Sequence, residues 1–193
     1  MAKALVIVAH PDDETIWMGG RIMREKEWEW TILSLCRKDD PDRKPKFFRV
    51  CSLLNARGFI SDMEDDHPEE DLPNMDEVRK RVSAVAMDKE FGTVFTHGSN
   101  GEYGHKRHIE THKCVLEMVS DGELRCSGLF TFDYARRESP FRCEPNPEST
   151  LRVELTSREH EMKRYLIRDA YGFQETSFEF LSCARTESFK RIV

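Results

Sequence analysis

The chain has 193 residues, a usual size for one domain, and it is long enough to bury a β-sheet between two layers of helices. Its 30 Lys and Arg against 36 Asp and Glu give a formal net charge of −6, which argues against nucleic acid as a partner because such binding needs clustered cations. A mean hydropathy of −0.65, with no run near the roughly 20 apolar residues of a membrane helix, predicts no membrane span.

Two further features bear on the compartment. The apolar residues 4–9 run directly into His10-Pro11-Asp12-Asp13-Glu14 and are too short for a secretory signal. The 6 cysteines are widely scattered and form no C-x-x-C pair, so we expect neither disulfides nor zinc binding by thiolates. The sequence therefore predicts a cytoplasmic protein with reduced thiols.

The first part of the chain has the pattern strand, helix, strand. Residues 4–9 form a continuous run rich in Val and Ile, which is typical of a strand buried on both faces of a parallel sheet. A helix is predicted over 14–28, in which Gly19 and Gly20 should allow close packing on a neighbouring element. Residues 30–36 are predicted to form the second strand.

A polar stretch comes next. Residues 37–46 contain two prolines and are predicted to be a loop, whereas 47–57 have helical periodicity and are followed by Gly58, a residue favoured just after a helix end. The segment 62–71 is mostly acidic, and we expect a mobile, solvated loop near the mouth of the site.

The second half continues the alternation of helices and strands. An amphipathic helix is predicted over 75–90, a strand over 92–96 that leads into His97, and another helix over 108–119. Two further strands are predicted over 129–132 and 151–155. A last helix is predicted over 156–170, and its residues Thr156 and Glu159 match a capping box.

Strands that alternate with helices predict a single α/β domain over residues 1–193, with a mostly parallel, Rossmann-like sheet covered by helices on both faces. In such sheets, binding sites form where loops leave the carboxyl ends of the strands. Polar clusters follow two of the predicted strands at this position. The first holds His10, Asp12 and Asp13, and the second holds 4 of the 7 histidines: His97, His105, His108 and His112.

These residue types match a catalytic zinc site. Two histidines and one carboxylate are a ligand set that leaves a position for water. Zinc lowers the pKa of that water and polarises a carbonyl oxygen, so the site could hydrolyse an unreactive amide. Of the two neighbouring aspartates we expect one to bind the metal and one to act on the water, because adjacent side chains point in different directions.

Other motifs are not supported. The sequence contains neither G-x-G-x-x-G nor G-x-x-x-x-G-K-[ST], so loops of these types that cradle phosphates are not expected. His108-Ile109-Glu110-Thr111-His112 has the histidine spacing of H-E-x-x-H, but its glutamate is displaced by one position. A metalloprotease is therefore a weak interpretation.

The string Ala9-His10-Pro11-Asp12-Asp13-Glu14, with Gly104-His105-x-x-His108 further along, resembles the PIG-L/LmbE superfamily of zinc-dependent N-acetylglucosaminyl de-N-acetylases. The resemblance extends to Tyr171-Gly172-Phe173-Gln174. It implies a lactate-dehydrogenase-like α/β fold.

The resemblance also implies roles for five residues. His10, Asp13 and His108 would bind one zinc ion per chain, although Fe²⁺ or Co²⁺ could occupy the same ligands. Asp12 would be the general base that takes a proton from water. His105 would stabilise the oxyanion intermediate as an imidazolium.

Several other residues are assigned less directly. By the resemblance, Tyr103 would close on the substrate and Arg49 would contact it. Glu14 either stabilises the start of the following helix or orients a metal ligand, and His97 and His112 are candidates for contact with the ligands.

The predicted function is therefore a zinc-dependent hydrolase that removes the acetyl group from the nitrogen of a small substrate, an N-acetylglucosamine derivative, to give acetate and a free amine. Two alternatives stay open: hydrolysis of another small amide, such as a thiol conjugate or an acylated amino compound, and a metal-binding module without turnover. A small N-acetylated molecule is the expected partner, and homo-oligomerisation is left open.

Overall fold

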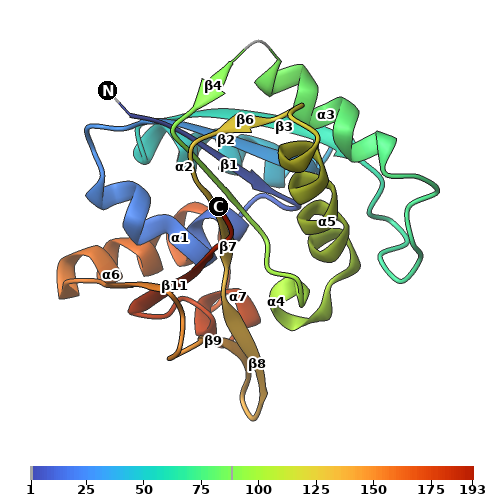
Figure 1. Cartoon of the computed structure of the whole chain (residues 1–193). Helices are drawn as coiled ribbons and strands as arrows, with labels where there is room; N and C mark the ends of the chain where they lie inside the picture. Colours follow the sequence, from blue (N-terminus) through green and yellow to red (C-terminus); the bar gives the residue numbers. More distant parts are fainter. Residues whose placement is uncertain (1, 88) are drawn as a thin grey trace.

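A seven-stranded sheet forms the centre of the computed structural model, which describes residues 2–87 and 89–193 (Figure 1). Its strands are β1 (Lys3–Val8), β2 (Glu29–Cys36), β3 (Ala56–Met63), β5 (Thr93–Thr96), β7 (Leu129–Phe132), β10 (Leu151–Glu154) and β11 (Thr186–Arg191). They lie in the order β10-β11-β7-β5-β1-β2-β3. The five from β7 to β3 are parallel, and β10 and β11 add two antiparallel pairings, so the mostly parallel sheet is confirmed.

Two small sheets and a set of helices complete the fold. β4 (Glu90–Phe91) pairs with β6 (Arg125–Cys126), and β8 (Tyr134–Glu138) with β9 (Phe141–Pro145). The helices are α1 (Asp13–Arg24), α2 (Arg43–Leu53), α3 (Asp76–Ala86), α4 (Gly101–Gly104), α5 (Lys106–Ser120), α6 (Ser157–Tyr165) and α7 (Phe178–Leu181), and α6 continues into a π-helical turn over Leu166–Ala170. Among the described residues, none of these helices has the length and apolar character that crossing a bilayer requires.

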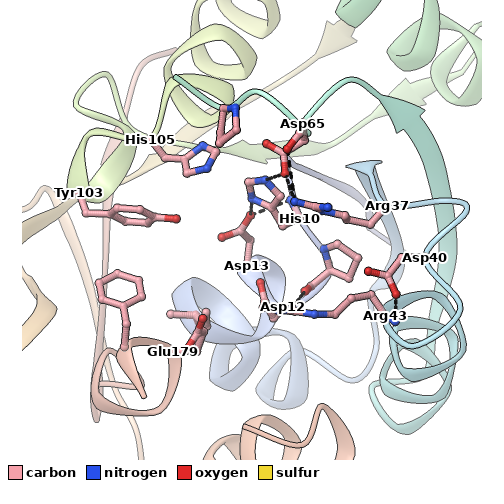
Figure 2. Close-up of a pocket in the computed structure, with 14 residues that line it drawn as sticks. His10, Asp12, Asp13, Arg37, Asp40, Arg43, Asp65, Tyr103, His105 and Glu179 are labelled. Carbon is pink, nitrogen blue, oxygen red and sulfur yellow. Dashed lines mark hydrogen bonds and ion pairs between the residues drawn. The ribbon is translucent and has the colours of Figure 1, made fainter. Parts of the chain in front are cut away.

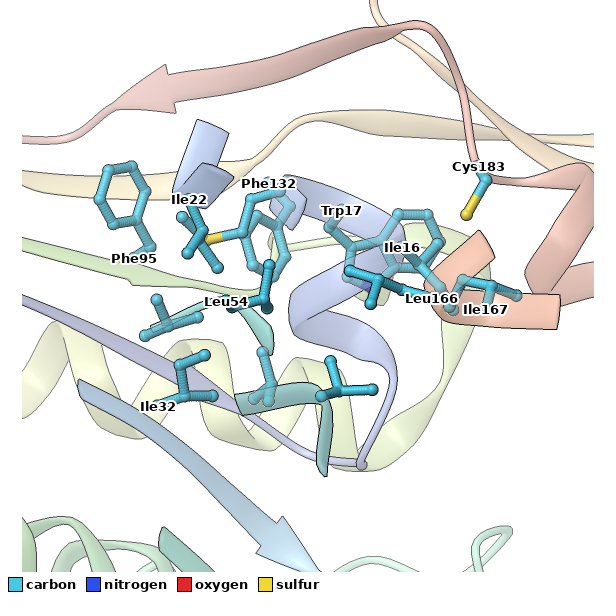
Figure 3. Packing of buried hydrophobic residues seen from close by; sticks show 14 of the residues in the cluster. Ile16, Trp17, Ile22, Ile32, Leu54, Phe95, Phe132, Leu166, Ile167 and Cys183 are labelled. Carbon is cyan, nitrogen blue, oxygen red and sulfur yellow. The ribbon is translucent and has the colours of Figure 1, made fainter. Parts of the chain in front are cut away.

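The central strand β1 supplies a hydrophobic core to each face of the sheet. Ala4, Val6 and Val8 contact the cluster that includes residues of α1, α2 and the π-helical turn (Figure 3). Leu5 and Ile7 point the other way, toward α3 and α5. Fully burying a Val, Leu or Ile side chain stabilises a fold by about 1.5–3 kcal/mol, so β1 is held from both sides. Its position brings the residues that follow Val8 to the middle of one sheet edge.

The start of α2 and the strand β3 differ from the sequence prediction. The helix begins at Arg43, inside the predicted loop, and ends at Leu53, whereas Gly58 lies within β3. A Cβ atom on Gly58 would lie 2.8 Å from the Cys51 sulfur, so the glycine permits α2 to pack on β3 and does not end a helix. β3 is an edge strand of mostly half-buried side chains, and its hydrophobic alternation is too weak to predict.

Other boundaries move for identifiable reasons. α1 ends at Arg24, four residues before the predicted end, where the carbonyl of Glu25 accepts hydrogen bonds from the Trp30 indole and the Trp28 backbone. The helix predicted over 75–90 is observed as α3, which ends at Ala86; Asp88, which falls in that prediction, lies outside the described residues.

The last third contains elements that the sequence did not predict. The β8–β9 hairpin, α7 and β11 are new, while the capping box of Thr156 and Glu159 at the start of α6 is confirmed. β11 has no apolar alternation because the buried Glu187 occupies one of its inward positions. This carboxylate accepts hydrogen bonds from Lys163, at 2.8 Å, and from the backbone N–H groups of Gly20 and Arg21. Partners distant in sequence thus make this polar strand stable.

The predicted close packing at the glycine pair of α1 is observed at Gly20. A Cβ atom there would overlap the Leu155 side chain and lie 2.9 Å from its Cγ. Gly19 has more room, since the nearest atom to its Cβ would be Cγ2 of Thr15 at 3.3 Å.

We expect Gly20→Ala to lower the free energy of unfolding by about 1–3 kcal/mol, because overpacking at Leu155 outweighs the gain in helix propensity. Gly19→Ala is the matched control and should change it by no more than about 1 kcal/mol. Urea unfolding of both variants measures the difference. Equal stability of the two would show that Leu155 moves aside without cost.

Candidate active site

A pocket of about 390 Å³ opens at the carboxyl ends of β1 and β5 (Figure 2). This is the point where the chain order reverses: β1 is followed by β2 and β3 on one side, and β5 and β7 lie on the other. Such switch points are the usual binding sites of open α/β sheets. The predicted residues His10, Asp12, Asp13, Tyr103 and His105 line the pocket. The His108 ring packs against His10 and His105, with ring centroids 5.3 and 4.8 Å away.

Three atoms of His10, Asp13 and His108 form a nearly equilateral triangle. His10 Nδ1 lies 3.2 Å from His108 Nε2 and 3.3 Å from Asp13 Oδ2, and the third side is 3.4 Å. In a tetrahedral zinc site with ligands at 2.0–2.1 Å, neighbouring ligand atoms are about 3.3 Å apart. The predicted ligands therefore fit a zinc ion in both chemistry and spacing.

Hydrogen bonds on the far side of each imidazole orient the two histidines. His108 Nδ1 lies 2.6 Å from the Glu102 carboxylate, and His10 Nε2 lies 3.1 Å from Asp65. A carboxylate at these positions accepts a hydrogen bond from a protonated ring nitrogen, which leaves the lone pair of the opposite nitrogen free to bind a cation. Sequence reasoning missed both carboxylates: Glu102 was not singled out, and Asp65 was expected in a solvated loop.

His97 lies beside the proposed ligand Asp13, but its ring nitrogens are used in hydrogen bonds within the protein. Its Nε2 lies 3.5 Å from Asp13 and accepts the backbone N–H of Ala9 at 2.9 Å. Since that lone pair is used, His97 carries its proton on Nδ1 and donates to Glu102 at 2.8 Å. His112 in turn donates to the His97 carbonyl. His97 thus lies beside the proposed ligand Asp13, whereas His112 contacts His97 and not a proposed ligand.

The site stabilises positive charge where the triangle lies. Burial disfavours the imidazolium of His108, but the charge of Asp13 and hydrogen bonds to Asp13 and Glu102 outweigh it and raise the pKa of His108 to about 10. Burial likewise opposes ionisation of Asp13, yet the neighbouring histidines hold the pKa of its carboxyl well below the usual range. A divalent cation would meet this electrostatic demand.

Asp12 points away from the triangle because its backbone adopts φ 123°, a conformation that is strained for a residue with a side chain. Glu14 stabilises this turn: it is fully buried and accepts hydrogen bonds from the Asp12 backbone N–H, the Thr15 hydroxyl and the Tyr171 hydroxyl. Burial and the charge of Asp13 raise the pKa of Asp12 to about 8, although Arg43 acts against them.

Two arginines, Arg37 and Arg43, line the pocket, and the predicted Arg49 is not one of them. Arg43, at the start of α2, lies 2.5 Å from the Asp12 carboxylate and stacks over Phe173. Arg49 lies on the exposed side of the same helix and is absent from the described residues that line the pocket. The predicted start of the helix at 47 concealed Arg43, which was placed in a loop.

His105 and Tyr103 form the wall opposite Asp12 (Figure 2). Tyr103 packs edge-on against His105 and Phe178, with ring centroids 5.7 and 4.6 Å away. Burial, together with positive charge on His108 and His10, lowers the pKa of His105 to about 3. These surroundings favour the neutral ring, which can still donate one hydrogen bond, whereas the imidazolium implied by the resemblance stays a prediction.

Comparison with known proteins places these features in a family context. A model of the family described as PIG-L, GlcNAc-PI de-N-acetylase, matches residues 5–119. The 1D-myo-inositol 2-acetamido-2-deoxy-alpha-D-glucopyranoside deacetylase of Corynebacterium diphtheriae is 23% identical over 157 residues, which cover 63% of this chain and 54% of that protein. The chain spans 54% of the length of this deacetylase and 62% of the length of a second relative, protein L374 of Acanthamoeba polyphaga mimivirus.

Solved structures share the fold at low sequence identity. The N,N'-diacetylchitobiose deacetylase of Pyrococcus horikoshii matches with a TM-score of 0.69 and 18% identity, over 98% of this chain and 83% of that one. The 4-carboxy-2-hydroxymuconate hydratase of Pseudomonas putida KT2440 also has a TM-score of 0.69, with 14% identity, over 100% and 97% of the two chains.

We expect Glu102→Gln to weaken zinc binding by about 10- to 100-fold, the usual effect of removing a group that orients a metal-binding histidine. Glu102 Oε2 accepts hydrogen bonds from both His97 and His108, and Oε1 accepts one from the Gly98 N–H, so an amide NH₂ group would face a donor at either position. Competition with a chromophoric chelator measures the affinity.

Glu187→Gln provides the control, because it removes another fully buried carboxylate that has no contact with the histidines. It should lower stability and leave the zinc affinity unchanged. An affinity of Glu102→Gln equal to that of the unsubstituted protein would contradict the orienting role.

Proposed function

Because the chain belongs to the PIG-L family of GlcNAc-PI de-N-acetylases, we propose that it is a metal-dependent N-deacetylase acting on a small substrate of the N-acetylglucosamine type. The observation that carries the proposal is the triangle of His10, Asp13 and His108 atoms beside the separate carboxylate of Asp12. A metal ion and a general base are the two components that hydrolysis of an unreactive amide requires.

His10, Asp13 and His108 would hold the metal, and zinc suits their nitrogen and oxygen donors. When bound, zinc supplies a Lewis acid that polarises the acetyl carbonyl and makes water more acidic. Asp13 is fixed for this purpose by its neighbours: Oδ1 accepts the Trp17 indole N–H at 2.9 Å, and Oδ2 accepts the backbone N–H of His10 at 2.8 Å.

Asp12 is the proposed general base. Its carboxylate faces the pocket, and its raised pKa makes it a stronger proton acceptor than an ordinary aspartate. The ion pair with Arg43 holds the carboxylate in place, and the turn stabilised by Glu14 keeps it away from the Asp13 oxygen that faces the histidines. After accepting a proton, Asp12 can deliver it to the leaving amine.

His105 and Tyr103 would act on the oxygen of the acetyl group. The neutral His105 ring can donate one hydrogen bond, and the Tyr103 hydroxyl is directed into the pocket (Figure 2). Burial raises the pKa of Tyr103, so the phenol keeps its proton. Donors held in place at a developing oxyanion are worth about 3 kcal/mol each in related chemistry.

The substrate class rests on the relatives. The Corynebacterium and Pyrococcus proteins are named as deacetylases of acetamido-sugar compounds, which favours an N-acetylated sugar over the non-sugar amides. The hydratase of the same fold shows that the fold alone does not determine the reaction, so turnover must be measured.

We expect the zinc-loaded protein to release free amine and acetate in equal amounts from N-acetylglucosamine derivatives. Removal of the metal by a chelator should abolish this activity, and added zinc should restore it. Labelling of the released amine, with non-sugar N-acetyl amides in parallel, measures the preference. If no N-acetyl compound is cleaved by a preparation shown to contain metal, the proposal fails.

Substitution of the two adjacent aspartates should affect different properties, metal binding for Asp13 and turnover for Asp12. Asp13→Asn should weaken metal binding by about 10-fold or more, because it changes a proposed ligand. Asp12→Asn should retain the metal and lose at least about 100-fold in rate, the scale of general-base assistance. Metal content and turnover, measured side by side under limiting zinc with folding checked by circular dichroism, separate the roles. The assignment is reversed if Asp12→Asn loses metal while Asp13→Asn keeps both.

A further inference from the structure

We propose that Asp65 is a positioning residue that orients His10 for metal binding, and that the acidic segment 62–71 places the Asp65 side chain against His10. The inference rests on the metal ligands of the proposed function. It concerns how His10 is held, which neither the sequence motifs nor the family match addresses.

The contact between Asp65 and His10 is direct. Asp65 Oδ2 lies 3.1 Å from His10 Nε2, the nitrogen on the far side of the ring from the ligand triangle. A carboxylate at this position accepts the Nε2 proton, which leaves the lone pair on Nδ1, the atom that faces His108 and Asp13. Among the described residues, no other hydrogen-bond partner of Nε2 would select this tautomer.

Asp65 is itself held by a second charge. Arg37 donates to the same oxygen, Oδ2, at 2.5 Å, and the Asp65 residue is only 7% exposed although the rest of its segment is largely solvated. A buried carboxylate is costly unless it is paired and hydrogen-bonded. Both interactions that offset this cost converge on the oxygen that meets His10, so the carboxylate cannot turn away without losing both.

Hydrogen bonds from α5, the helix that contains His108, hold the segment that carries Asp65. Arg107, the residue before His108, is buried and donates to the backbone carbonyls of Glu64, His67 and Glu70. Its guanidinium also pairs with the Glu64 and Glu110 carboxylates. One helix therefore supplies a metal ligand and, from the adjacent residue, the clamp that brings Asp65 to the other histidine.

The test compares zinc affinity, and not activity alone, in three variants. Asp65→Ala should bind zinc about 10- to 100-fold more weakly than the unsubstituted protein, as for other groups that orient metal-binding histidines. Asp65→Asn should recover part of this loss, because its amide oxygen can still accept the His10 proton. Asp66→Asn removes the same charge from the neighbouring side chain, which is 88% exposed, and should bind zinc within twofold of the unsubstituted protein.

A second measurement needs no metal. In the metal-free protein, ¹⁵N NMR at a pH high enough for the His10 ring to be neutral should show its proton on Nε2, and in Asp65→Ala a substantial population should carry it on Nδ1. Circular dichroism and thermal unfolding establish that each variant is folded, and Asp65→Asn, with nearly the same shape, keeps the test valid if the alanine variant does not fold.

The outcomes separate this inference from the proposed function. Zinc binding by Asp65→Ala within twofold of the unsubstituted protein, or an unchanged His10 tautomer, overturns the role of Asp65 and leaves the deacetylase proposal intact. A protein that binds zinc but cleaves no N-acetyl compound overturns the function, while the order of affinities still decides on Asp65. Failure of the unsubstituted protein to bind zinc removes both.

Discussion

The arrangement of the histidines in the pocket depends on the hydrogen bonds of one buried carboxylate, that of Glu102. One of its oxygens accepts hydrogen bonds from His97 and His108, and the other accepts a hydrogen bond from the Gly98 backbone N–H. His97 in turn accepts the N–H of Ala9, so a continuous line of hydrogen bonds joins the end of β1, the end of β5 and the start of α5. Three separate pieces of chain are thereby fixed relative to one another, and the ligand atoms they carry converge.

Hydrogen bonds and ion pairs also turn the neighbouring carboxylates of Asp12 and Asp13 in different directions. Asp13 is held toward the histidines by the Trp17 indole and the His10 backbone N–H. Asp12 is turned the other way by a strained backbone that Glu14 stabilises, and it meets Arg43 in the open part of the pocket. Strain at a functional residue persists only where the surroundings hold it, and here a glutamate two residues along does so.

The fold positions the site but does not choose its chemistry. A parallel sheet with its order reversed beside β1 offers a crevice to almost any ligand, and a hydratase and a deacetylase both share this architecture. The chemistry depends on the side chains that line the crevice. The raised pKa of His108 and the depressed pKa of Asp13 show that these surroundings favour positive charge, and the pKa of the Asp12 carboxyl beside them is raised.

The sequence by itself determined the features that depend on neighbours along the chain: the doubly buried strand β1, the string from Ala9 to Glu14 at its end, and the capping box at the start of α6. It also predicted the sheet, because alternating strands and helices leave few other packings. Only the tertiary structure decided the supporting contacts. Asp65, Glu102 and Arg43 act on residues 55, 6 and 31 positions away, and each belongs to a segment that reads as an ordinary loop or polar helix. A charged side chain in such a segment is usually solvated, and only the folded chain shows that these three are turned inward toward the histidines and aspartates.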